Sequence, residues 1–250
     1  MKTTHNISSQ VKTLVLIACT FLTFGQTVFG QKSNQKSEEI AKITRFQVKQ
    51  EYVEQLKKLI SDYVKLSLST DANIMAEGYF EENVPSTLWL FERWNTKEAF
   101  TKANISTKAI KELSKTALVE PEKEIYVKDI EPISKNQWRK TSSLGDNQLT
   151  IMLFVDAKKG TESKFKKVYH QAMPQFRSEL GVVTYQLSQL ENDKSQFVTF
   201  EKFRSKEAFQ YHLNFPPIQP VIDFLDTSIK KQPFQEGLHT LIEFTPLTRQ

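Results

Sequence analysis

The chain of 250 residues contains one cysteine, seven glycines and nine prolines. A single cysteine excludes an intramolecular disulfide, and so little glycine excludes collagen-like and flexible low-complexity chains. Charged residues make up 25% and hydrophobic residues 39%, so the chain can form one large core or two smaller ones. The net charge of +5 is not gathered in a basic stripe, and we expect neither nucleic acid nor an anionic membrane as a partner.

The first 30 residues have the order of a secretory signal peptide. Lys2 and Lys12 precede an apolar run from Leu14 to Leu22, and small residues follow as far as Gly30. The run is too short and too interrupted to predict a membrane span. We therefore expect residues 1–30 to be cleaved, residues 31–38 to form a polar tether, and the protein to be exported to the periplasm or secreted.

A lipoprotein is the alternative, because residues 16–19 (Leu-Ile-Ala-Cys) resemble a bacterial lipobox. The apolar stretch before Cys19 has only about six residues, whereas signal peptides usually have about 7–15. We favour export without lipidation through Cys19. Cleavage after Gly30 removes the only cysteine and leaves 32 basic and 29 acidic residues, a net charge of +3.

The rest of the chain is an internal duplication. Residues 91–100 align with residues 200–209 at an offset of 109, and six of the ten positions are identical. Residues 130–133 resemble residues 244–247 at an offset of 114. Because both matches occur in the same order, we predict two tandem repeats, at 39–135 and 147–250.

Hydrophobic periodicity predicts the same element order in both repeats. We expect first-repeat strands at 40–48, 73–80, 87–94 and 124–130 with helices at 51–68 and 96–117, and second-repeat strands at 148–156, 182–190, 197–203 and 238–244 with helices at 162–180 and 205–225. The last helix of each repeat is expected to break, in the second repeat at Pro216, Pro217 and Pro220. Gly181 is expected to end a helix in the left-handed conformation.

The order βαββαβ predicts an α+β, ferredoxin-like fold for each repeat. A single sheet of this type has one face in water, so its strands should alternate apolar and polar residues. Residues 88–91 and 151–155 are instead apolar throughout. We therefore predict that the sheets of the two repeats pack face to face within one chain, with the helices outside.

Residues 179–187 and 200–213 of the second repeat combine a glycine at a helix end, a strand ending near a tyrosine, and the pattern E-x-F-x-S-x-E-A-F-x-x-H. In these features the repeat resembles the antibiotic biosynthesis monooxygenase (ABM) domain, a family that includes small quinol monooxygenases. The first repeat keeps only the core at 92–100 and has Ala103 in place of His212. The resemblance implies a dimeric α/β barrel, formed here as an intramolecular pseudodimer that could associate further.

The resemblance also implies a site for a flat aromatic molecule between the sheet and helices of the second repeat. His212 is the candidate catalytic base, because an imidazole titrates near neutral pH; the alternative is a helix-end residue bonded to a carbonyl. Trp94 and its counterpart Phe203 are candidates for stacking on the substrate, or are core residues. Tyr185 is a candidate donor to a quinol oxygen or a cross-strand packing residue, and the role of Tyr211 is left open.

Glu92 and Glu201 recur on the third strand of each repeat. They are either buried acids or members of structural salt bridges, and we expect salt bridges with Arg93, with Lys202 or with a facing strand.

Other chemistries have little support. Leu113 and Ile222 stand where haem-degrading relatives need an iron-ligating histidine, His170 is expected on a solvated face, and His239 has no partner in sequence. No spacing suits zinc, and no G-x-G-x-x-G, P-loop or G-x-S-x-G motif occurs, so we expect no metal and no cofactor.

These observations predict an exported tandem ABM-domain protein that oxidises a quinol or phenolic aromatic molecule without a cofactor. The first repeat, which lacks the histidine, is expected to be mainly structural. The alternatives are a non-enzymatic small-molecule-binding or scaffold protein of the same fold, and a periplasmic interaction protein tethered through Cys19.

Overall fold

The first repeat folds in the predicted order. The structure, a computed structural model, describes residues 39–131, 140–143, 145–230 and 237–245; the predicted signal peptide, Cys19 and the polar tether lie outside them. The elements of the first repeat are β1 (Ile40–Gln47), α1 (Val53–Leu68), β2 (Asn73–Glu81), β3 (Thr87–Trp94), α2 (Lys97–Asn104), α3 (Lys108–Ala117) and β4 (Lys123–Asp129).

The second repeat has the same elements at nearly the same offset. They are β5 (Leu149–Asp156), α4 (Glu162–Ser178), β6 (Val182–Leu190), β7 (Gln196–Phe203), α5 (Lys206–Leu213), α6 (Gln219–Ser228) and β8 (Leu238–Glu243). The pairing register shifts between residues 73 and 75 of β2 and between residues 182 and 184 of β6, so even this irregularity recurs at an offset of 109. The repeat boundaries 39–135 and 147–250 extend beyond the described residues and stay predictions.

The ends and breaks of the helices follow from local sequence. The Thr96 and Ser205 hydroxyls accept the N–H groups three residues ahead and so cap α2 and α5. The last helix of each repeat is interrupted by a 3-10 turn, at Ile105–Thr107 in the first and Pro216–Ile218 in the second. The predicted break at the prolines is confirmed, because proline lacks the backbone donor that a continuous helix requires.

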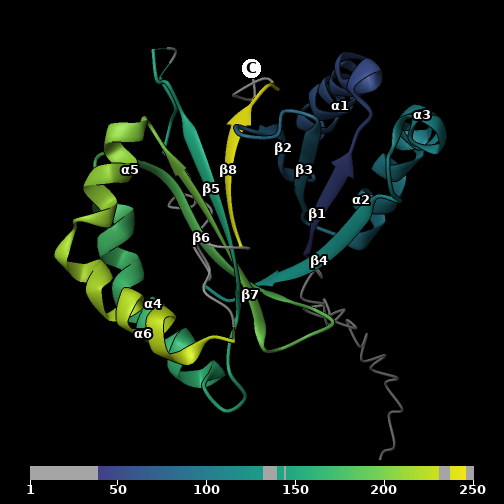
Figure 1. Ribbon diagram of the computed structural model, residues 1–250. Coiled ribbons are helices and arrows are strands. Elements are labelled where there is room, and N and C mark those ends of the chain that lie inside the picture. Colours follow the sequence, from purple (N-terminus) through teal and green to yellow (C-terminus); the bar gives the residue numbers. More distant parts are fainter. Residues whose placement is uncertain (1–38, 132–139, 144, 231–236, 246–250) are drawn as a thin grey trace, which may run out of the picture. The chain divides into compact units, whose positions relative to one another are not determined.

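The eight strands close into one antiparallel barrel in the order β1-β3-β2-β8-β5-β7-β6-β4. Each repeat supplies four neighbouring strands, and two seams join the repeats, β2 with β8 and β4 with β6. Figure 1 shows α1–α3 on one side of the strands and α4–α6 on the other. The predicted α+β fold is confirmed. The two sheets are also hydrogen-bonded edge to edge, which leaves no strand edge unpaired.

Alternate residues of the strands fill the inside of the barrel. Successive side chains of a strand point to opposite faces, and a barrel of eight strands is just wide enough for side chains to fill. The interior core draws on both repeats: Ala41, Ile43, Met75, Tyr79, Trp89, Phe91, Ile125, Val127, Met152, Leu190, Val198, Phe200 and Leu241. Two further cores lie between the sheet and the helices of each repeat.

Two buried ion pairs lie inside the barrel near its seams. The Arg93 guanidinium donates to both carboxylate oxygens of Asp129, at 2.7 and 2.9 Å. The Lys202 ammonium contacts Glu243 at 2.8 Å and Glu77 at 3.0 Å. Since Glu77 belongs to the other repeat, the second network crosses between the repeats, and each buried charge has a partner of opposite sign.

Glu92 and Glu201 do not pair with the basic residues next to them. Arg93 and Lys202 face the barrel interior, and adjacent strand residues face opposite ways, so the two glutamates lie under the helices. The expected pairing with Arg93 and Lys202 is therefore wrong. The expected pairing with a facing strand is confirmed for Glu92, whose neighbour across β1 is Lys42.

Gly181 is required for a different reason from the one predicted. Among the described glycines, Gly160 at φ 88° is the one with positive φ, so Gly181 is not left-handed. A Cβ at Gly181 would lie 2.5 Å from the Cβ of Ala208 in α5. The glycine therefore permits close contact between the loop after α4 and helix α5.

We predict that Gly181→Ala lowers the free energy of unfolding by about 1–3 kcal/mol, because the new methyl group meets a rigid helix position. Urea denaturation measures the change. Gly145→Ala is the matched control, since a Cβ at Gly145 meets nothing within 4 Å. Adding Ala208→Gly to Gly181→Ala should recover part of the loss. Equal effects of Gly181→Ala and Gly145→Ala would contradict the steric explanation.

Candidate functional site

A cleft of about 510 Å³ lies in the first repeat, between α1, α2 and the end of β3. Its volume is in the range of about 300–1,000 Å³ that is typical of small-molecule sites. We call it the Trp94 cleft. It is lined by Tyr63, Leu66, Ser67, Thr70, Ala72, Trp94, Thr96, Glu98, Ala99, Lys102, Ala103 and Ser106.

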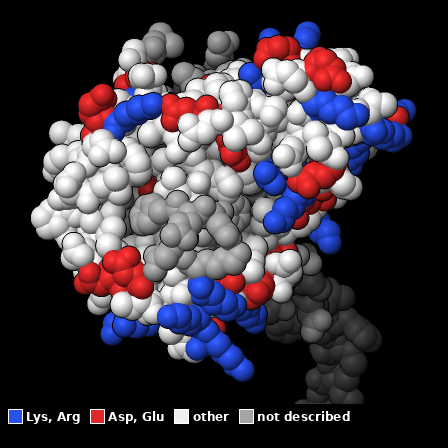
Figure 2. Space-filling model, in the orientation of Figure 1, with Lys and Arg blue, Asp and Glu red and all other residues white. Residues whose placement is uncertain are grey.

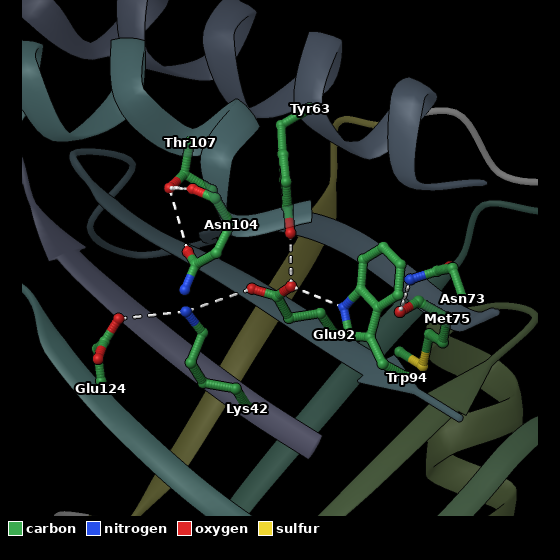
Figure 3. A network of polar contacts seen from close by, with 9 residues as sticks. All are labelled: Lys42, Tyr63, Asn73, Met75, Glu92, Trp94, Asn104, Thr107 and Glu124. Carbon is green, nitrogen blue, oxygen red and sulfur yellow. Dashed lines mark hydrogen bonds and ion pairs between the residues drawn. The ribbon is translucent and has the colours of Figure 1, made fainter. Parts of the chain in front are cut away.

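Two lining residues of this cleft, Tyr63 and Trp94, point to the buried carboxyl group of Glu92 (Figure 3). The Tyr63 hydroxyl donates to Glu92 Oε1 at 2.7 Å, and the Trp94 indole N–H donates to the same oxygen at 2.9 Å. Lys42 Nζ lies 3.5 Å from the other oxygen, Oε2, and 3.2 Å from Glu124. Two lining residues of the cleft thus hold a charged group that has no exposed surface.

Burial and the neighbouring carboxylates set the protonation states of Tyr63 and Lys42. Burial raises the pKa of Tyr63, and the Glu92 carboxylate raises it further, so this hydroxyl stays protonated as a donor. Burial lowers the pKa of Lys42, but Glu92 and Glu124 outweigh that effect, and the net pKa is raised. The ammonium therefore stays charged between two carboxylates.

The Ser67 hydroxyl lies beside that of Tyr63 at the floor of the cleft. It is buried, and its interaction with the Tyr63 hydroxyl lowers the pKa of Tyr63. Ser67 therefore belongs to the buried polar group around Tyr63 and Glu92.

Large side chains fill the corresponding space in the second repeat. At the offset of 109, Ser67 corresponds to Phe176 and Ala103 to His212. The rings of Phe176 and His212 are in contact, with centroids 4.8 Å apart. The same fold therefore has a cleft where these two side chains are small, and packed core where they are large.

His212 is buried, with 1% of its surface exposed. Its Nδ1 lies 2.7 Å from Glu179 Oε1, so its partner is a carboxylate and not the expected carbonyl. Its Nε2 has no hydrogen-bond partner among the described residues. Its role as a base stays a prediction.

The other predicted site residues do not gather around one cleft. Tyr185 and Phe203 are buried beside His212, each with its ring centroid 5.3 Å from the imidazole. Tyr211 is 60% exposed and stacks on Phe215. Trp94 lines the cleft in the other repeat. Three predicted residues therefore form a buried cluster, and one lies at the cleft.

Lys42, Tyr63 and Ser67 were not predicted from the sequence. A comparison of the repeats contained the signal: Lys42 corresponds to Ile151, and Tyr63 to Ala172. A polar residue that aligns with an apolar one in the same fold marks a difference in chemistry. Such a difference forms a site only because helix α1 and strands β1 and β3 bring these positions together.

The remaining histidines have local roles. His170 is largely exposed, as predicted, and contacts Glu131 at 3.1 Å. His239 contacts Glu81 at 3.1 Å, so it has a partner that the sequence did not indicate. Within the described residues, no three His, Cys, Asp or Glu side chains gather as metal ligands would, and no helix is long and apolar enough to cross a bilayer.

The architecture defines the class of the protein: an intramolecular dimeric α/β barrel of two ferredoxin-like repeats. Residues 149–221 match the family model of the antibiotic biosynthesis monooxygenases. The second repeat thus matches the ABM family model, in agreement with the resemblance in its sequence. The first repeat lies outside this match.

Solved structures share the whole fold. A proposed monooxygenase from Lactobacillus acidophilus NCFM superposes with a TM-score of 0.71 and 15% identity, over 84% of this chain and 96% of that one. One from Fusobacterium nucleatum subsp. nucleatum ATCC 25586 gives 0.68 and 16%, over 84% and 99%. An anthrone oxidase-like protein gives 0.57 and 7%, over 84% and 92%. A search of curated protein sequences found no significant match.

We predict that Tyr63 contributes to loss of stability in alkali. Its pKa is raised in the folded state, so its contribution is complete below the unfolded tyrosine pKa of about 10 and is lost as the pH rises above it. Above about pH 10 the free energy of unfolding decreases as the pH rises. In Tyr63→Phe this decrease should be smaller than in the wild type, by up to about 1.4 kcal/mol per pH unit. Urea denaturation between pH 8 and about 11 tests this. An unchanged slope would contradict it.

Proposed function

We propose that the protein is a cofactor-independent monooxygenase that oxidises a phenolic or quinol aromatic molecule with molecular oxygen in the Trp94 cleft. The observation that carries the proposal is a cleft of about 510 Å³ above a Tyr63–Glu92 hydrogen bond. The ABM domain and the fold shared with proposed monooxygenases support this class of reaction. The proposal moves the site to the first repeat, because Phe176 and His212 occupy the equivalent space in the second.

The lining of the cleft suits a flat aromatic ring with a hydroxyl group. Leu66, Ala99 and Ala103 supply apolar walls, and Trp94 contributes to the lining although only 1% of it is exposed. The hydroxyl of Tyr63, another lining residue, supplies a polar end. On the face in Figure 2, basic and acidic side chains are interspersed, so that face offers no large area of one sign to a polyanion.

The proposed reaction needs a proton acceptor and oxygen. The substrate phenol gives its proton to Tyr63, whose own proton passes to Glu92 across the 2.7 Å hydrogen bond. The phenolate transfers an electron to oxygen, and the two radicals join at a ring carbon that carries hydrogen, para to the phenolic oxygen in a simple phenol and ortho to it in a 1,4-quinol.

Glu92 then returns the proton, again through Tyr63, to the peroxide. Loss of water from the hydroperoxide gives the quinone. One oxygen atom enters the ring, the other leaves as water, and the substrate supplies all four electrons. No other reductant is needed.

We also propose export, on the basic, apolar and small-residue order of residues 1–30. Binding without turnover, or a scaffold role, is the alternative for the same fold. A scaffold role is supported by the second repeat, where the Phe176 and His212 rings pack against each other in the space equivalent to the cleft.

We predict that the purified protein, free of metal, consumes oxygen with a panel of phenols and hydroquinones. Tyr63→Phe should lower kcat/KM about 100-fold or more, because it removes the proton carrier. His212→Gln is the discriminating variant: it should leave uptake within about twofold if the Trp94 cleft is the site. Loss of uptake in His212→Gln but not in Tyr63→Phe would place the chemistry in the second repeat. No uptake, with an aromatic ligand still quenching tryptophan fluorescence, would support binding without turnover.

We further predict that a second cleft can be opened. Phe176→Ser, Glu179→Thr and His212→Ala together copy Ser67, Thr70 and Ala103 of the first repeat. Calorimetric titration with 1-naphthol should give one site per chain in the wild type and two in the triple variant. Because the variant loses core packing, its folding is first checked by circular dichroism. One site in a folded triple variant would contradict the proposal that these side chains close the second cleft.

A further inference from the structure

We propose that Lys42 is a positioning residue that keeps Glu92 in its anionic form as the proton acceptor beneath the Trp94 cleft. The inference concerns a residue outside the cleft, which acts through Glu92 and not on the substrate. Its kinetic consequence rests on the proposed function, whereas its effect on the Glu92 carboxyl can be measured without any turnover.

The geometry places Lys42 between two acids. Its Nζ lies 3.5 Å from Glu92 Oε2 and 3.2 Å from Glu124 Oε1. The Lys42 side chain is 4% exposed, Glu92 is fully buried, and the Glu124 side chain is 36% exposed. Figure 3 shows the three side chains in a row that ends at the Tyr63 hydroxyl and the Trp94 indole. The ammonium therefore links the buried carboxylate beneath the cleft to a carboxylate at the surface.

A buried ion pair of this kind is not needed for the fold. Removing a lysine and a glutamate from water costs several kcal/mol per ion, and well-packed apolar residues often do as well or better. The second repeat contains that apolar solution, with Ile151 at the position of Lys42. The second repeat thus folds without a charge at this strand position. We infer that Lys42 has a role other than packing.

The whole environment of the glutamate differs between the repeats. The three groups that contact Glu92, namely Lys42, Tyr63 and Trp94, correspond to Ile151, Ala172 and Phe203, which are all apolar. Glu201 is held instead by the Thr199 hydroxyl at 2.6 Å and by Tyr185. Burial raises the pKa of Glu201, and His212 and Thr199 lower it only in part. In the second repeat, therefore, burial is the largest influence on the pKa of the carboxyl at this strand position.

A small cavity lies beside the ion pair. It has a volume of about 20 Å³ and is lined in part by Lys42, Thr44, Glu92 and Asn104. Thr44 Oγ1 is buried beside it without a hydrogen-bond partner among the described residues, and Glu92 Oε2 faces the Lys42 ammonium at 3.5 Å. Buried polar atoms of strands β1 and β3 therefore border this hollow next to the ion pair.

The charged and titratable groups that face Glu92 come from four elements. They are Lys42 on β1, Tyr63 on α1, Lys111 on α3, and Glu122, Glu124 and Tyr126 on or next to β4. Of these, Lys42 is the buried cation in contact with Glu92. Its positive charge favours the ionised carboxylate, which is the form that can take the proton from Tyr63.

The test compares Lys42→Met with the matched control Lys111→Met, an exposed lysine that lines the same small cavity. The pH dependence of kcat/KM is measured between pH 5 and 9 with a phenol that the wild type oxidises. We expect the acid limb to move up by about 1–3 pH units in Lys42→Met, with recovery to near the wild-type value at high pH. Lys111→Met should move it by less than about 0.3 unit, and Lys42→Arg should restore most of the wild-type profile.

A second measurement does not require activity. In protein with ¹³C-labelled glutamate, the signal assigned to the Glu92 carboxyl carbon should titrate about 1–3 pH units higher in Lys42→Met than in the wild type. A pH-independent loss of kcat/KM, or an unchanged carboxyl titration, overturns the inference. If no phenol is oxidised, the proposed function fails while the carboxyl titration still decides the role of Lys42. If Lys42→Met does not fold, Lys42→Gln replaces it in both measurements.

Discussion

The apolar character of both faces of the strands is the constraint on which the rest of the structure depends. A strand such as Leu149–Asp156 has side chains in the barrel core and side chains under the helices, and almost all of them are buried. Neither repeat can satisfy both faces by itself, because its helices cover only one. The duplicate covers the other, and the seams between β2 and β8 and between β4 and β6 then close the barrel.

Covalent duplication allows the two halves to diverge while the barrel stays closed. The barrel requires matched strands and a filled interior from both repeats, but it requires little of the space between each sheet and its helices. That space is packed by Phe176 and His212 in one repeat and left open by Ser67 and Ala103 in the other. Packing stabilises the second repeat, and the small side chains leave room for a ligand in the first.

The buried glutamates show the same divergence in their electrostatics. Glu92 and Glu201 occupy equivalent positions, and both are buried beneath helices. Glu92 has a lysine, a tyrosine and a tryptophan as partners, whereas Glu201 has hydroxyl groups and a nearby histidine. A carboxylate with a buried cation suits proton acceptance, and a carboxyl whose pKa is raised by burial suits a structural hydrogen bond. One sheet position thus has two chemistries within a single chain.

The sequence alone determined the duplication, the order of strands and helices, the helix breaks and the need to cover a second sheet face. All of these follow from local periodicity and from matches at a constant offset. Tertiary structure decided the rest. Position 181 requires a glycine because Ala208 of α5 lies too close for a Cβ atom. Arg93 and Glu92 lie on opposite faces of the sheet because adjacent residues of a strand point in opposite directions. Lys42, Tyr63 and Trp94 meet at Glu92, although the first and the last lie 52 positions apart in the sequence. Distances across the fold, which no local pattern encodes, decide which polar groups share a site.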